Sequence, residues 1–164
     1  MASSVLDLYR RVTRWPGGQW LFSRGVCWQA PYFASIAPRV GVLKPGCCEA
    51  TIRHRRKVTN HLGTVHAIAL CNLAELAAGL MTDATIPDSM RWIPKGMSVR
   101  YLKKAHGTLV GTAKPEFEIA TADSGYELPV RVEVRDGAGD LVFDAAVAMW
   151  LSPSPSAAPA SRSA

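Results

Sequence analysis

The chain has 164 residues, of which 48% are apolar and 20% are charged, and its formal net charge is +6. This length suits one domain around one hydrophobic core, and the composition is that of a soluble globular protein, which excludes a disordered or fibrous chain. No run of about 18 apolar residues lacks a charge or a turn residue, so we expect no membrane span.

Residues 1–30 predict a helical segment made of two short helices. The sequence PGG at 16–18 separates two groups of apolar side chains that recur at helical spacing. These side chains are Val5, Leu8, Tyr9, Val12, Trp20, Leu21 and Phe22. Asp7, Arg10 and Arg11 interrupt the apolar core that a signal peptide needs, so we expect a cytoplasmic protein.

The rest of the chain predicts six strands and one long helix. Alternating apolar and polar residues from Arg39 predict a β-hairpin that turns at 44–46, and four more alternating segments follow the most apolar run. These four segments are GMSVRYLKKA, TLVGTAKPEFEI, ELPVRVEVRD and LVFDAAVAMWL. Residues 152–164 are rich in Ser, Pro and Ala and predict a disordered tail, so residues 1–151 form the single domain.

The apolar run between these groups of strands predicts a helix from Val65 to about Thr82. Thr64 is the expected N-cap, and Pro87 ends any continuation of the helix. Because this helix is apolar nearly all round, we expect an antiparallel sheet of about six strands to wrap around it, in an α+β fold.

Glu75 stands out because it is a carboxylate on this enclosed helix. On a wheel of about 100° per residue it shares a face with small or short side chains within about 60°, whereas the large leucines lie opposite. The members of this face are Ile68, Cys71, Asn72, Ala78, Gly79 and Thr82. A buried carboxylate needs a partner, access to solvent or a raised pKa, and structural and catalytic roles are equally open to it.

His66 precedes Glu75 by nine positions, which puts it on the opposite side of the helix and roughly 13 Å away along the axis. The two residues can therefore cooperate only across a dimer with antiparallel helices. The helix N-terminus would then bring the backbone N–H groups of Ala67 and Ile68, and the positive end of the helix dipole, toward the partner's carboxylate.

The motif N-x-x-G-x-x-H-x8-E consists of Asn60, Gly63, His66 and Glu75. Together with the order of hairpin, enclosed helix and four strands, it resembles the hotdog-fold acyl-CoA thioesterases over residues 39–151. Its variant NHxGTxHA is similar to the poorly characterised DUF4442 branch of that superfamily. The resemblance implies a hotdog fold and a homodimer, alone or paired into a tetramer.

The resemblance also implies the hydrolysis of an acyl-CoA thioester, with Glu75 as general base or nucleophile. In such enzymes backbone N–H groups at the helix start hold the thioester oxygen, and the residue matched by Asn60 positions water or substrate from the other subunit. Many relatives have His-Gly-Gly where this chain has His-Ala-Ile at 66–68. The candidate catalytic residues are therefore Glu75, Asn60 and His66, and the candidate oxyanion and substrate-binding residues are Ala67, Ile68, Gly63 and His61. No cofactor is implied, since coenzyme A enters as part of the substrate.

Two other functions remain open from the sequence. Hotdog dehydratases are similar in having a histidine before the helix, here His61, and an acidic residue on it, here Glu75, but the Phe-Pro and Pro-Gly elements that flank their histidine are absent. A non-catalytic acyl-binding hotdog dimer is the third candidate. Hydrogen bonding in the loop that enters the helix is the alternative role for His61 and His66, and a local turn is the alternative for Asn60.

The basic residues and cysteines limit the choice of partners. No aromatic interleaving or recognition helix accompanies the basic groups, so we expect no nucleic acid. Candidate contacts for coenzyme A phosphates are Arg53, Arg55, Lys57, Lys103 and Lys104. The four cysteines show no CxxC spacing, so we expect buried free thiols and no metal site. Candidates for an acyl pocket, or for the core, are Trp28, Trp92, Tyr101 and Trp150.

Overall fold

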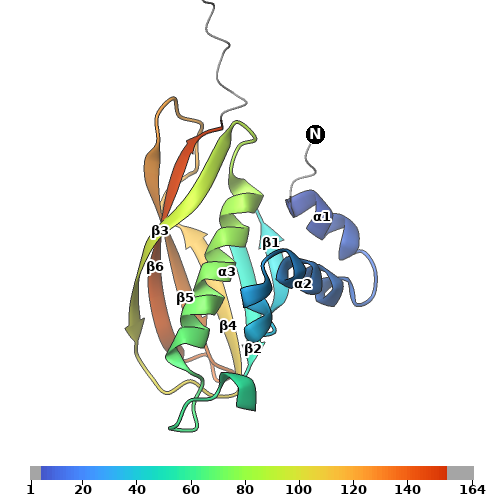
Figure 1. The fold of residues 1–164 in the computed structure, drawn as a ribbon, viewed down its shortest axis with the longest axis vertical. Coiled ribbons are helices and arrows are strands. Elements are labelled where there is room, and N and C mark those ends of the chain that lie inside the picture. Colours follow the sequence, from blue (N-terminus) through green and yellow to red (C-terminus); the bar gives the residue numbers. More distant parts are fainter. Residues whose placement is uncertain (1–4, 155–164) are drawn as a thin grey trace, which may run out of the picture.

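The computed structural model describes residues 5–154 (Figure 1). Its helical elements are α1 (Val5–Val12), α2 (Gly18–Gln29), η1 (Pro31–Ser35), η2 (Arg56–Val58) and α3 (Ala67–Thr85). Its strands are β1 (Arg39–Lys44), β2 (Cys47–Arg53), β3 (Met90–Tyr101), β4 (Thr108–Pro115), β5 (Tyr126–Arg135) and β6 (Leu141–Pro153). The predicted elements are thus present in the predicted order. Strand β6 continues two residues past the expected domain end, and residues 155–164 of the predicted tail lie outside the described residues.

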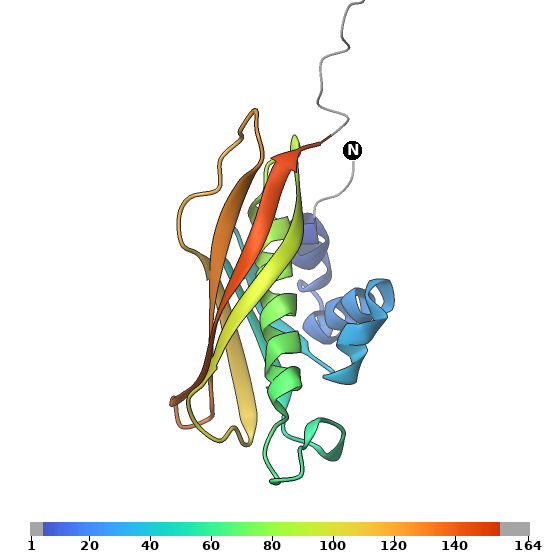
Figure 2. The same ribbon diagram turned by 60° about the vertical axis from the view of Figure 1, so that its left-hand side comes forward.

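The six strands form one antiparallel sheet in the order β1-β2-β4-β5-β6-β3. The sheet curves around α3, which packs against its inner face (Figures 1 and 2). Gly111 on β4 allows a close approach, because a Cβ there would lie 3.1 Å from Cγ of Leu73 on the helix. The predicted sheet wrapped around one long helix is therefore confirmed.

Helix α3 forms the centre of the hydrophobic core. Leu73, Leu76 and Met81 are almost completely buried under the sheet. By length and composition α3 is the one helix within residues 5–154 that could cross a bilayer, but most of it is buried inside the fold. Helix α3 is therefore the core helix of the fold. The four cysteines are free thiols, and three of them are buried.

The start of α3 corrects one prediction. The N-cap is His66, whose side chain accepts a hydrogen bond from the Ile68 N–H, and the helix runs from Ala67 to Thr85 rather than from Val65 to Thr82. Thr64 is not the cap because the two residues after it lie outside the helix: the N–H groups of Val65 and His66 donate to the carbonyl oxygens of Ala105 and Val58, at 2.9 and 2.7 Å. The predicted stop is confirmed, since the helix ends just before Pro87.

The N-terminal helices cover one edge of the sheet. Tyr9 and Gln19 donate side-chain hydrogen bonds to the carbonyl oxygen of Gly41 on β1, at 2.7 and 2.9 Å. The hydroxyl of Ser23 accepts from the N–H of Val40 at 2.9 Å. These contacts satisfy backbone groups that an edge strand leaves unpaired. At the other edge, β3 pairs only with β6, so its outer side is open.

Candidate active site

Glu75 lies at the margin of a cavity of about 420 Å³ between α3, β3 and the N-terminal segment. Its side chain is exposed in the single chain, so of the three conditions stated for this carboxylate, access to solvent is the one that is met. No hydrogen bond or ion pair joins it to another residue of the range 5–154. The carboxylate is therefore available to a ligand or to a second copy of the chain.

The walls of this cavity are mostly apolar. They come from three parts of the chain and include Val26, Ala30, Phe33, Leu76, Leu80 and Trp92. Gly79 brings Trp92 close to α3, because a Cβ at this glycine would lie only 3.0 Å from Cη2 of the indole. Of the four aromatic residues predicted for an acyl pocket, Trp92 is the one in the walls of this cavity.

Asp83 is a second carboxylate in the wall of the same cavity, and sequence reasoning missed it. The indole N–H of Trp92 donates to its Oδ1 at 2.5 Å. Desolvation raises the pKa of the Asp83 carboxyl above its usual value, and the indole hydrogen bond partly offsets this shift. Its spacing of eight positions after Glu75 was a usable signal, because it places both carboxylates on one side of α3.

The loop before α3 is held by Asn60. Its side-chain oxygen accepts from the N–H groups of Leu62 and Thr64, both at 3.0 Å, and its amide donates to the Thr64 hydroxyl. Gly63 has a φ of 73°, a left-handed conformation that favours glycine. Asn60 thus has a local structural role in the single chain, and its catalytic role stays a prediction.

The first two N–H groups of α3 differ in their hydrogen bonding. The Ile68 N–H donates to Nδ1 of His66 at 3.1 Å, so a neutral His66 ring carries its proton on Nε2. The Ala67 N–H donates to no acceptor within residues 5–154. Of the two predicted oxyanion donors, Ala67 is therefore the one already free to bind a ligand.

The predicted site residues are divided among separate surfaces. Asn60, Ala67, Lys103 and Lys104 line one cavity of about 330 Å³. His66 and Ile68 line another, of about 160 Å³. Neither contains Glu75, so a single chain does not bring this carboxylate and the N–H groups together. His61 is exposed in the loop that precedes α3.

The basic residues that are candidates for contacts with coenzyme A phosphates differ in their interactions. Arg55 donates to the carbonyl oxygen of Ser35 at 2.8 Å, and Lys103 pairs with Asp140 at 3.0 Å. Lys104 and Arg53 are exposed and make no ion pair in the described part of the chain. Lys104 is therefore the basic residue beside Ala67 that is freest to meet a phosphate.

An exposed apolar strip lies between α3 and the open β3 edge. Met97 and Tyr101 pair with the buried residues Val147 and Phe143 of β6, so they face the helix side of the sheet, yet both remain exposed. The Tyr101 hydroxyl lies 3.2 Å from Sγ of Cys71 on α3. This hydrogen bond, together with burial, raises the pKa of Tyr101 to about 12.

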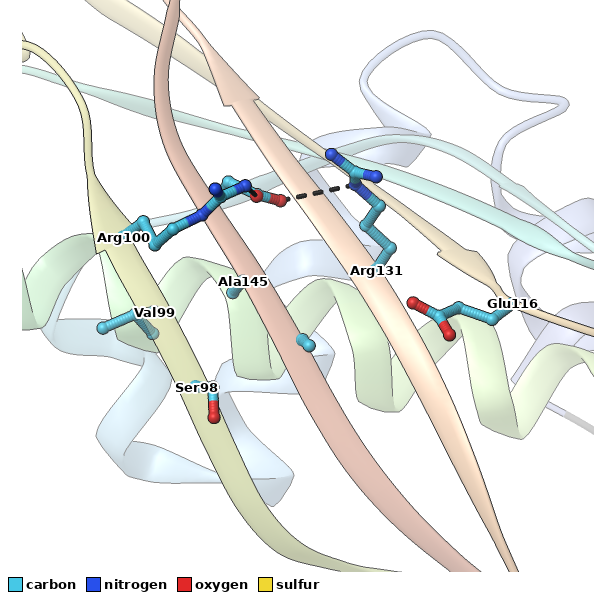
Figure 3. Close-up of a pocket in the computed structure, with 8 residues that line it drawn as sticks. Ser98, Val99, Arg100, Glu116, Arg131 and Ala145 are labelled. Atoms are coloured by element: carbon cyan, nitrogen blue, oxygen red, sulfur yellow. Dashed lines mark hydrogen bonds and ion pairs between the residues drawn. The ribbon is translucent and has the colours of Figure 1, made fainter.

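The outer face of the sheet carries a separate charged cluster (Figure 3). Asp144 is buried and forms ion pairs with Arg100 of β3 and, at 3.4 Å, with Arg131 of β5. These residues line a cavity of about 260 Å³ on the side of the sheet away from α3. This cluster joins three neighbouring strands and is distinct from the Glu75 cavity.

Comparisons with known proteins show which family the chain belongs to. The family model described as "Domain of unknown function (DUF4442)" matches residues 18–151. No curated protein matches the chain. A solved structure described as "genomics APC5556" is 43% identical, with a TM-score of 0.78, and the match covers 92% of this chain and 99% of that one.

More distant solved structures show the same fold. PA5026 of Pseudomonas aeruginosa, described as a probable thioesterase of unknown function, is 21% identical over 82% of this chain and 95% of its own, with a TM-score of 0.70. The thioesterase HI1161 of Haemophilus influenzae is 13% identical over 79% and 87%, with a TM-score of 0.67. The chain therefore belongs to the DUF4442 family and has the hotdog fold of these thioesterase structures.

Proposed function

We propose that the protein hydrolyses acyl-CoA-type thioesters at a site completed by a second copy of the chain. The observation that carries this proposal is Glu75, an unpaired carboxylate beside an apolar cavity of about 420 Å³. Cavities of this size and character are typical of small-molecule sites. The likeness of the fold to thioesterase structures supports the choice of reaction.

The chemistry needs few groups because a thioester carbonyl is already electrophilic. Glu75 takes a proton from water, and the resulting hydroxide attacks the carbonyl carbon. The free N–H of Ala67 of the partner subunit donates to the oxygen that becomes negative in the tetrahedral intermediate. Collapse of the intermediate breaks the C–S bond, and the protonated Glu75 returns its proton to the departing sulfur, so that the carboxylate and the thiol of coenzyme A leave and Glu75 is regenerated. Lys104, an exposed cation that makes no ion pair in the described part of the chain, is the proposed contact for the phosphates of coenzyme A.

A panel of short, long and aromatic acyl-CoAs tests this function through thiol release. We expect turnover of at least one class, with long chains favoured by the apolar cavity walls. Retention of acyl-CoA without thiol release would instead indicate the acyl-binding function. Water addition to an enoyl-CoA without thiol release would indicate a hydratase.

The dimer that this site requires is supported by the open β3 edge and the apolar strip beside it. Met97→Glu puts a charge on that strip, so we expect the dimer to dissociate and thioester hydrolysis to fall with it. Light scattering coupled to size-exclusion chromatography measures the first effect. Ile93→Glu is the matched control because Ile93 pairs with Trp150 on the outer face of the same strand. A dimeric, active Met97→Glu variant would place the subunit contact elsewhere.

A further inference from the structure

The N-terminal helical segment carries a group of large apolar side chains that face solvent. Trp28 is 86% exposed and Trp15 is 74% exposed, although tryptophan usually buries most of its surface. We name this group the aromatic surface; it consists of Trp15, Trp20, Leu21, Trp28 and Tyr32. It contains three of the five tryptophans in the sequence.

Helix α2 presents three of these side chains, Trp20, Leu21 and Trp28, along one face. Trp20, Arg24 and Trp28 follow one another at intervals of four residues, so they form a single stripe on the helix. The opposite side of α2 buries Phe22 against the fold. A surface helix normally turns a polar face to water, and α2 instead turns an aromatic face with one arginine in it.

The charge of this segment is strongly one-sided. Residues 5–35 contain four arginines and a single acidic residue, Asp7, whose carboxylate lies 3.9 Å from Arg10. Arg11 lines one apolar hollow of about 390 Å³ together with Trp15, Trp20 and Leu21. Aromatic and cationic groups therefore share one surface.

We propose that the aromatic surface docks on anionic phospholipid membranes. Tryptophan and tyrosine rings are amphipathic and settle at the headgroup level of a bilayer, where apolar neighbours enter the acyl boundary. Arginines are attracted to the negative surface potential of anionic lipids. A symmetric contact between two copies of this surface would instead bring their arginines together.

The aromatic surface lies away from the open edge of β3. The N-terminal helices lie beside the β1 edge, and the open β3 edge is at the other end of the sheet (Figures 1 and 2). The inner side of α2 contributes Val26 to the wall of the cavity beside Glu75. Docking would thus hold that cavity close to the lipid surface while the β3 edge stays available to a second subunit.

Vesicle binding by the full-length protein tests this inference without any assay of hydrolysis. We expect flotation with vesicles that contain about one third phosphatidylglycerol to be at least tenfold stronger than with phosphatidylcholine alone. Raising the salt concentration to about 0.5 M should release most of the protein. Brominated lipids should quench tryptophan fluorescence, because Trp15, Trp20 and Trp28 enter the bilayer.

Matched variants identify the surface responsible. Trp20→Ser/Trp28→Ser and Arg11→Gln/Arg24→Gln should each weaken binding to anionic vesicles about tenfold. Two control pairs, each at exposed positions elsewhere, should stay within about twofold of the unmodified protein. These controls are Leu62→Ser/Ile93→Ser for apolar surface and Lys44→Gln/Lys114→Gln for charge.

Three outcomes would overturn the proposal. They are the absence of binding to anionic vesicles, equal losses in test and control variants, and a lower oligomeric state of Trp20→Ser/Trp28→Ser in solution. The last result would assign the aromatic surface to a contact between copies of the chain. Circular dichroism of each variant verifies that α1 and α2 remain folded.

Discussion

Glu75→Gln is expected to lower acyl-CoA hydrolysis by about a hundredfold or more, which corresponds to about 2.7 kcal/mol of activation free energy. Glutamine keeps the shape of the side chain but does not accept a proton from water. Because the Glu75 carboxylate makes no hydrogen bond or ion pair with another residue of the described chain, its replacement should leave the stability of the fold nearly unchanged. Steady-state thiol release and thermal unfolding measure the two effects.

Two further variants make this result specific. Glu127→Gln removes an exposed carboxylate from β5, away from the cavity, and should keep full activity. Asp83→Asn changes the other carboxylate in the cavity wall. If hydrolysis survives in Glu75→Gln and disappears in Asp83→Asn, the catalytic base is Asp83 and the proposed mechanism is wrong.

The fold could be predicted because its signals are local. Alternation marked the strands, and the enclosed helix was apolar all round, so the order of elements sufficed for the architecture. The N-cap of α3 was harder, since both Thr64 and His66 can accept a helix N–H. The choice depends on the tertiary structure, because the N–H groups of Val65 and His66 donate to distant carbonyl oxygens and the helix starts only after them, so that His66 caps Ile68.

The site was only partly predictable because its contacts join distant segments. The helical wheel placed Glu75 on a face with small residues, but it contains no information on how far β3 covers that face. The contact between Trp92 and Asp83 depends on how β3 packs beside α3. The outer cluster depends on the register that puts Arg100 opposite Asp144. Neither contact can be predicted without the tertiary structure.

Ala67→Pro is expected to lower turnover by about 10²- to 10³-fold, the usual effect of losing one oxyanion donor. Proline lacks the backbone N–H, and Ala67 is the first residue of α3, where proline is well tolerated. The preceding residue, His66, has φ −64° and ψ 138°, an extended conformation that suits a residue before proline. The helix should therefore form normally while the donor disappears.

Ala67→Gly is the matched control, because it changes the side chain and keeps the N–H. It should retain most of the activity, whereas unfolding temperatures should be similar for both variants. An Ala67→Pro protein as active as the unmodified one would exclude this N–H as the oxyanion donor. The donor would then be sought at Ile68, which becomes free when the His66 ring rotates away.

Mixing the two inactive variants tests whether the site spans two subunits. In a dimer of one Glu75→Gln chain and one Ala67→Pro chain, the intact Glu75 of one chain meets the intact Ala67 of the other at one of the two sites. Random exchange of equal amounts should therefore restore about one quarter of the original activity. If both residues served a site within one chain, every site in the mixture would carry a defect. No activity would then return, although each parent variant would still fold and dimerise.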